Sequence, residues 1–272
     1  MRRLQGYDGP PLACGQGRMW WLGQMGLMVR LGGTRLCVDY FAAAHEKRRT
    51  APPVPAQDLR DVDVFLGTHD HLDHMDHESW RIFKDACPNA RFVFPAAHLD
   101  RALADGIDRA RLVPLNDGES AVLGDVIVRA VAAAHEFLDR DEETGFYPAL
   151  MYVLEGNGLR ILHMGDTLRY EGLLPRLRAF GPIDAALLPI NGRDAERYER
   201  SCIGNMTFQE AVDLAGELGV RLAIPGHWDM FADNSADPDA FASYLRVKYQ
   251  GRVPGLIPSC GALIGLSAPP SA

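Results

Sequence analysis

Short apolar runs separated by glycines dominate the first part of the chain, and this is the pattern of strands joined by tight turns. Segment 18–40 contains several such runs, with Gly32-Gly33 placed between two of them like a hairpin turn. We therefore predict two or three antiparallel strands in this segment. Asn157-Gly158 divides the apolar segment 149–167 in the same way and predicts a second hairpin.

Further apolar runs of strand length follow through the middle of the chain, and two more lie nearer its end. These runs occupy residues 61–69, 90–98, 111–115, 120–124, 126–135, 183–190 and 220–227. Segment 42–60 differs from them, because it combines a charged run with three prolines. That composition predicts an irregular surface connection, which is also a candidate lid over a site.

Three segments carry helix signals instead. Residues 77–90 have the composition of a short helix that ends near a proline. In segment 207–219, Thr207 and Glu210 have capping-box spacing, one face is apolar, and a glycine stands at the end. Segment 237–250 begins with an Asp-Pro pair, which suits a helix start. The order of strands then helix, repeated, predicts an antiparallel-rich sheet sandwich covered by helices.

Composition narrows the class of protein further. A chain of 272 residues with 47% hydrophobic residues can bury one large core, so we expect a single domain over residues 1–272. The net charge of -8 and the pI near 5.6 argue against nucleic-acid or anionic-membrane partners. Any anionic substrate must therefore be bound by a local cluster of cationic side chains.

The cysteines and the start of the chain bear on its location. The five cysteines are odd in number and lie far apart, which favours reduced thiols over disulfides. Residues 1–15 contain no apolar stretch of the kind found in export signals, and no run is long enough to span a bilayer. We expect an unexported, cytoplasmic protein.

Four of the nine histidines lie in the stretch GTHDHLDHMDH, residues 67–77, directly after a predicted strand. His69 and His71 are two residues apart, so in an extended chain their side chains project to the same side and can bind one metal ion. Asp73 and His74 are adjacent, so they can reach a common ion only if the backbone turns. They suit a second, neighbouring ion, because imidazole and carboxylate are common ligands of divalent metals.

Two neighbouring ions need more ligands than one loop supplies. The further ligands are expected at the ends of strands, because those positions are rigid. Three further residues end predicted strands: His135, Asp166 and His227. We predict that His69, His71 and His135 bind one ion. We predict that Asp73, His74 and His227 bind the other. Asp166 then bridges both ions.

This ordered set of motifs, THDHLDH, a later strand-end histidine, GD and a C-terminal PGH, resembles the metallo-β-lactamase superfamily of metal-dependent hydrolases. The resemblance covers nearly the whole chain. It implies an α/β fold, an αββα sandwich with a dinuclear metal site at one edge of the two sheets. Its ligands match the seven positions named above.

A narrower resemblance is to the L-ascorbate-6-phosphate lactonase-like group. It rests on MWWLGQMGLMVR and GGTRLCVDYF near the start, on THDHLDHMD and HMGDT, and on IGNMTFQEA and IPGHWDMF. The resemblance implies hydrolysis of a lactone or related ester of a small, sugar-like and phosphorylated molecule. It also implies a homo-oligomer.

Three residues are candidates for binding such a phosphate. Asn191 and Arg193 follow a predicted strand, and Asn205 precedes the helix that begins near Thr207. A helix N-terminus favours anions, and the guanidinium fork of arginine suits phosphate. The alternative is that Arg193 pairs with the acidic side chains of residues 194–199.

The predicted ligands lead to a mechanism. Metal-bound water has a pKa near 7, so a nucleophilic hydroxide is available at neutral pH to attack a carbonyl. Asp73 is the catalytic residue that we expect to orient this hydroxide or to move its proton. A small-molecule phosphodiesterase is the alternative enzyme, because the same site serves phosphorus equally well. A redox protein and a purely structural metal protein are less well supported. No segment remains for a flavin domain, and structural zinc sites are usually cysteine-rich.

The metal itself is not decided by the ligand types. A set of nitrogen and oxygen ligands without cysteine admits zinc, manganese or iron. The lactonase resemblance favours manganese, and the wider superfamily favours zinc. We expect two divalent ions per chain.

Overall fold

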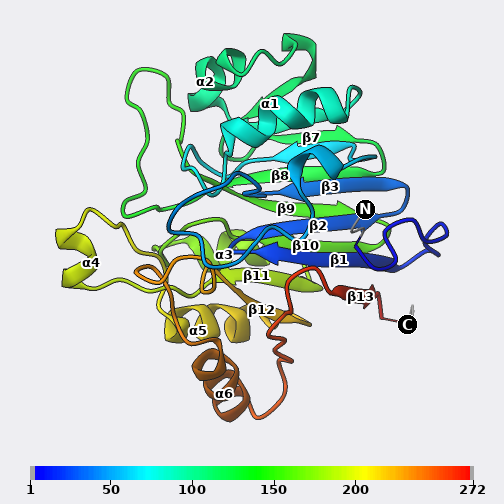
Figure 1. The fold of residues 1–272 in the computed structure, drawn as a ribbon. Helices are drawn as coiled ribbons and strands as arrows, with labels where there is room; N and C mark the ends of the chain where they lie inside the picture. The colour runs from blue at the N-terminus through cyan, green and yellow to red at the C-terminus, as the bar shows by residue number, and fades with distance from the viewer. Residues whose placement is uncertain (1–3, 270–272) are drawn as a thin grey trace.

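Two β-sheets packed face to face form the centre of the computed structural model, which describes residues 4–269 (Figure 1). The first sheet has the order β13 (Leu263–Ser267), β1 (Gln16–Gly23), β2 (Gly26–Leu31), β3 (Thr34–Val38), β4 (Val64–Leu66), β5 (Arg91–Pro95) and β6 (Leu112–Leu115). The second has the order β12 (Ala223–Gly226), β11 (Ala185–Pro189), β10 (Leu159–His163), β9 (Leu150–Gly156), β8 (Val126–Ala132) and β7 (Ser120–Leu123).

Helices cover the outer face of each sheet. The helices are α1 (His77–Ala86), α2 (Leu99–Ala104), α3 (Leu173–Arg178), α4 (Ala195–Glu199), α5 (Phe208–Leu218) and α6 (Pro238–Tyr249). Short 3₁₀ turns occur at η1 (Ala56–Asp58), η2 (Ala96–His98) and η3 (Arg109–Arg111). Side chains of α1 and α2 pack on the first sheet, and those of α3, α5 and α6 pack on the second. The fold is therefore an αββα sandwich, as the sequence predicts.

The alternation of side chains along β1 explains how three apolar layers form from one chain. Met19 and Trp21 belong to the core between the two sheets, whereas Trp20 and Leu22 belong to the layer under α1. All four side chains are buried. Because successive strand residues point to opposite faces, a fully apolar strand must be covered on both sides.

Most predicted elements are confirmed. Both predicted hairpins form, β2–β3 at Gly32-Gly33 and β9–β10 at Asn157-Gly158. The capping box of Thr207 and Glu210 starts α5, and Asp237 caps α6. The prediction of an antiparallel-rich sheet is confirmed only in part. Among residues 4–269, six strand pairs are antiparallel, but β3 to β6 run parallel, and so do β10 to β12.

The structure also adds elements that the sequence pattern does not predict, namely α2, α3, α4 and β13. Within residues 4–269, no helix is both long enough and apolar enough to cross a bilayer. Part of the N-terminal segment that we expected to lack an export signal, residues 1–3, lies outside the described residues.

Candidate metal centre

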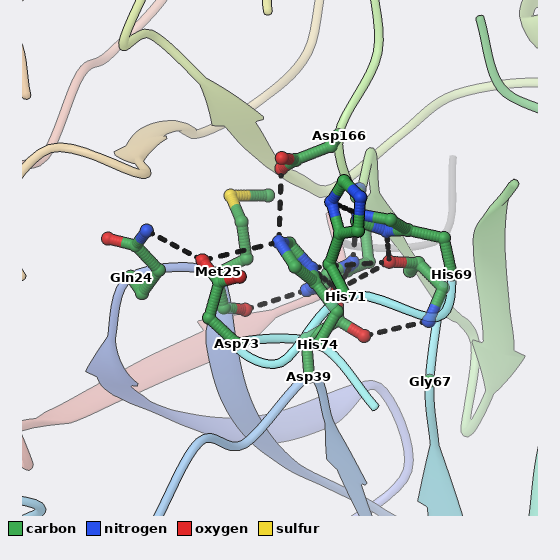
Figure 2. Close-up of polar contacts among 12 residues, drawn as sticks. Gln24, Met25, Asp39, Gly67, His69, His71, Asp73, His74 and Asp166 are labelled. Atoms are coloured by element: carbon green, nitrogen blue, oxygen red, sulfur yellow. Dashed lines mark hydrogen bonds and ion pairs between the residues drawn. The ribbon is translucent and has the colours of Figure 1, made fainter. Parts of the chain in front are cut away.

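The seven predicted ligands come together at one edge of the sandwich, beyond the carboxyl ends of four strands. His69 follows β4 by three residues, His135 follows β8 by three, and Asp166 follows β10 by three. His227 follows β12 directly. The backbone turns after His71, where the carbonyl of His71 accepts the backbone N–H of His74 at 3.0 Å. This turn lets the residues of one short loop point in two directions (Figure 2).

The first group contains three imidazoles. His69 Nε2 lies 3.0 Å from His71 Nδ1, and His135 Nε2 lies 3.2 Å from the same atom. Ligand atoms around a tetrahedral ion with bonds of about 2.0 Å are separated by about 3.3 Å. The three nitrogens therefore have the spacing of three ligands of one ion.

The second group combines imidazoles with carboxylates. Asp73 Oδ2 lies 3.6 Å from His74 Nε2 and 3.5 Å from His227 Nε2. The two oxygens of Asp166 lie 3.3 Å from His74 Nε2 and 3.2 Å from His227 Nε2. Asp166 also forms a ligand group with His69 and His74, with the ligand atoms within 4.8 Å of one another. This position between the two groups is the one that a bridging carboxylate requires.

Two buried atoms support a cation at this position. His74 Nε2 and Asp166 Oδ1 are buried without a hydrogen-bond partner. Leaving buried polar atoms unsatisfied is costly, whereas a divalent ion between them satisfies both. The donor set of histidine nitrogens and carboxylate oxygens is also one that divalent metals accept. The residues present therefore fit a metal ion, although metal binding by these residues remains a prediction.

The electrostatics differ between the two groups. Burial alone would lower the pKa of His74, but the carboxylates of Asp166, Asp73 and Asp39 raise this pKa well above its ordinary value. Burial would raise the pKa of Asp166, but His227 and His74 hold it well below its ordinary value. The carboxylates thus create a negative potential that favours positive charge at this point, as a cation site must.

Two histidines of the first group, His69 and His135, are held neutral. Burial lowers the pKa of His69 well below its ordinary value and lowers that of His135 to about 4. A neutral imidazole has a free nitrogen lone pair, which is the form that binds metal. These histidines are therefore ready to bind an ion at neutral pH.

Asp39 and Thr68 orient two of the ligands, and the sequence analysis did not identify either residue. Asp39 Oδ2 accepts hydrogen bonds from His74 Nδ1 and from Thr68 Oγ1, each at 2.7 Å. Thr68 Oγ1 lies 3.1 Å from His69 Nδ1. With Nδ1 engaged in this way, the Nε2 atoms of both histidines point toward the site. The one signal in the sequence was the position of Asp39 at the end of a predicted strand.

His77 begins α1, as we expected, and it also bridges two carboxylates. His77 Nε2 lies 2.6 Å from Asp70 Oδ1, and His77 Nδ1 lies 2.5 Å from Asp105 Oδ2. Asp70 stands between the predicted ligands His69 and His71. His77 therefore ties the ligand loop to the segment that follows α2.

A cavity of about 210 Å³ opens beside the first group of ligands. Its lining residues are His69, Asp70, His71, His98, Ala133, His135, Phe137, Asp139, Pro148 and Ala149. His98 is one of these lining residues, and its Nε2 lies 2.7 Å from the carbonyl of Pro148. The lining contains two carboxylates and no lysine or arginine.

The three predicted substrate-binding residues lie outside that lining. Asn205 Nδ2 donates to Asn191 Oδ1 at 3.0 Å, and Asn191 Nδ2 donates to Asn234 Oδ1 at 2.7 Å. Arg193 forms a two-pronged pair with Glu210, with distances of 2.7 and 2.8 Å. Pairing of Arg193 was the alternative, although the partner is Glu210 rather than an acid of residues 194–199. Contact of these residues with a substrate remains a prediction.

The αββα sandwich and the grouped histidines and aspartates at its edge define a metallo-hydrolase of the β-lactamase fold. Residues 34–228 match the family model described as the beta-lactamase superfamily domain, and the chain belongs to that family.

Similar proteins agree with this family. A UPF0173 protein of Pyrococcus furiosus is 29% identical over 83% of this chain and 89% of its own length. A probable L-ascorbate-6-phosphate lactonase of Salmonella heidelberg is 26% identical over 84% of this chain and 73% of its own length. The solved structure of a metallo hydrolase from Ignicoccus hospitalis has a TM-score of 0.73, with 17% identity, and the match covers 93% of this chain and 100% of that one.

Proposed function

We propose that the protein hydrolyses a lactone or ester of a small, sugar-like molecule with the help of two divalent ions. The observation that carries this proposal is the pair of ligand groups that meet at Asp166 and open into the cavity beside His71 and His135. The similarity to a protein named as a probable lactonase supports the choice of a lactone over other substrates.

Bound ions would supply a nucleophilic hydroxide at neutral pH and would stabilise the negative charge that develops on the carbonyl oxygen. The protein's own residues supply the positioning. Asp73 is kept ionised and can accept a hydrogen bond at Oδ2. Burial would raise its pKa, but His74 and His227 lower this pKa below its ordinary value. We propose Asp73 as the group that orients the nucleophile or moves its proton.

The cavity bears on the substrate. Phe137, Pro148 and two alanines give it an apolar wall, and Asp139 adds a carboxylate, whereas Asp70 is already paired with Arg101 and His77. The apolar wall supports an uncharged group in this part of the cavity, because an ionised group there would lose hydration. The phosphate that the resemblance implies has less support, since the guanidinium of Arg193 is already paired with Glu210.

Two kinds of ligand group favour different metals. Three histidine nitrogens suit zinc well, and additional carboxylate oxygens also suit manganese and iron. We propose zinc or manganese as the metal, with iron as a third candidate.

The test is activity profiling of the metal-free protein reconstituted with zinc, manganese or iron. The panel should contain sugar lactones, simple esters and phosphodiesters, with each sugar lactone present in phosphorylated and unphosphorylated form. We expect turnover of lactones by the metal-loaded protein and none without metal. Turnover of diesters alone would replace the lactonase proposal by the phosphodiesterase alternative.

The same panel decides the role of Arg193. If Arg193 binds a phosphate, Arg193→Ala raises KM for a phosphorylated lactone and leaves the unphosphorylated analogue unchanged. Equal effects on both substrates, or no effect on either, would leave Arg193 as the structural partner of Glu210.

A further inference from the structure

Gln24 lies at the tip of the β1–β2 hairpin, and its backbone is fixed from several sides. Its N–H donates to Asp229 Oδ1 at 2.8 Å, and its carbonyl accepts from the backbone N–H of His227 at 3.0 Å and from Trp21 Nε1 at 2.9 Å. Gln24 has a φ of 54°, a left-handed conformation that costs a residue with a Cβ on the order of 1 kcal/mol. These contacts hold the hairpin tip against the predicted ligand His227.

The side chain of Gln24 is fully buried and points into the second ligand group (Figure 2). Its Nε2 lies 2.9 Å from Asp73 Oδ2 and 3.2 Å from His227 Nε2. The ligand atoms of this group are separated from one another by 3.2 to 3.6 Å. The same Nε2 also lies 3.2 Å from His227 Nδ1, so the end of the amide lies beside Asp73 and the His227 ring at distances like those between the ligand atoms.

The other end of the amide lacks a partner. Gln24 Oε1 is buried and accepts no hydrogen bond from any described residue. A half-turn about the last side-chain torsion exchanges Oε1 with Nε2, because the two ends of an amide have the same shape. The oxygen then lies beside Asp73 Oδ2 and the ring of His227, two of the four predicted ligands of the second ion. A carbonyl oxygen aimed at carboxylates is repelled unless a cation stands between them.

We propose that Gln24 Oε1 is an additional ligand of the ion held by Asp73, His74, His227 and Asp166. This inference rests on the two-metal function proposed above. It gives the buried amide oxygen a partner, and it gives the strained hairpin tip the role of holding this side chain at the site. It also makes the two ions unequal, since the second has three oxygen and two nitrogen ligands while the first has three histidine nitrogens and the shared carboxylate of Asp166. Oxygen-rich coordination of higher number favours manganese or iron over zinc at the second ion.

Three substitutions separate a metal ligand from a hydrogen-bond donor. Gln24→Glu keeps an oxygen at the same reach but cannot donate to Asp73 when ionised. Gln24→Met keeps the length of the side chain and removes both the oxygen that could bind metal and the N–H group that donates to Asp73. Gln24→Gly removes the side chain and also relieves the left-handed backbone, so it tests the role even if Gln24→Met fails to fold.

The readout is Mn²⁺ binding to the metal-free protein, measured by the electron paramagnetic resonance signal of free Mn²⁺. We expect the wild type to bind two ions. We expect Gln24→Met and Gln24→Gly to lower the affinity for one of the two ions by at least about tenfold. Removing a residue that only supports a metal ligand already lowers metal affinity by about this factor. We expect Gln24→Glu to bind that ion as tightly as the wild type or more tightly.

If Gln24→Glu weakens the ion as much as Gln24→Met, Gln24 acts as a donor to Asp73 and the ligand assignment is overturned. Unchanged binding in Gln24→Gly overturns it as well. Failure of the wild type to bind two ions is a different result, because it contradicts the dinuclear function before any Gln24 variant is compared.

Discussion

Gly165 lies so close to Thr68 that a Cβ on the glycine would come within 2.8 Å of Thr68 Cβ and 2.9 Å of Thr68 Oγ1. The glycine also has a φ of 56°, in the left-handed region. Its small size lets the loop that holds Asp166 approach the hydroxyl that orients His69. The spacing between the two ligand groups therefore depends on a residue without a side chain.

Gly165→Ala should lower both stability and metal affinity. The left-handed backbone penalises the alanine by roughly 1 kcal/mol, and the contact with Thr68 adds to this cost. Thermal unfolding and metal titration of the variant measure both effects. Gly118→Ala is the matched control, because Gly118 has a φ of 77° and open space around its Cβ position. Equal losses in the two variants would show that the contact with Thr68 does not matter.

Asp166→Ala should remove more metal than the loss of any single histidine ligand, because a bridging carboxylate serves both ions. Elemental analysis of the purified variant measures the number of ions per chain. Asp139→Ala is the control, since this acid lines the same cavity without belonging to a ligand group. Full metal content in Asp166→Ala would contradict the dinuclear assignment.

Asp73→Asn keeps the shape of the side chain and removes its charge and basicity. If Asp73 binds the second ion and orients the nucleophile, turnover should fall by at least about a hundredfold. Turnover is measured on the best lactone from the panel, beside the metal content of the same sample. Near-normal turnover with intact metal content would remove Asp73 from the reaction.

His77 should make the stability of the metal-free protein depend on pH. The hydrogen bond to Asp105 raises the pKa of His77 above its ordinary value of 6.5, burial opposes this, and Asp70 raises the pKa further. The resulting stabilisation is fully present below pH 6.5 and is lost as the pH rises through the higher pKa of the folded state. His77→Gln should therefore lower the free energy of unfolding more at pH 5.5 than at pH 9, by on the order of 1–3 kcal/mol. Urea unfolding at the two pH values measures this difference.

His98 provides the control of opposite sign. Burial lowers the pKa of His98, so its neutral form contributes stability above pH 6.5 that is lost as the pH falls. His98→Gln should lower the free energy of unfolding less at pH 5.5 than at pH 9. The same direction in both variants would mean that the pH dependence does not come from these individual side chains.

The sequence predicted the grouped histidines and aspartates because their spacing carries geometric information. His69 and His71 share a side of the chain, and His135, Asp166 and His227 end apolar runs, so the pattern predicted a common site at strand ends. The location of this site at one edge of the two sheets came from the family resemblance. The sandwich itself followed from apolar runs of strand length and from turn residues. Parallel pairing was missed, because the side-chain pattern of a strand does not state which neighbour it pairs with.

Residues that act through tertiary contacts gave little or no sequence signal. Gln24 is an ordinary amide in a hairpin, and only the folded structure places it against Asp73 and His227. The place of His98 in the cavity gave no sequence signal, because its partner, the carbonyl of Pro148, is 50 residues away in the chain. The short helices α3 and α4 have too few turns for an apolar period to stand out.

Strand β3 is an interior strand only because β1, β2 and β13 continue the first sheet beyond it. Those three strands lie outside residues 34–228, the segment that defines the family. A fragment trimmed to that segment would expose the backbone N–H and C=O groups of β3 along an open edge, which is a template for aggregation. It would also lack the hairpin that carries Gln24. Any fusion or shortened version of the protein must therefore keep β1, β2 and β13, because these strands cover the edge of β3 in the sheet that supports the metal ligands.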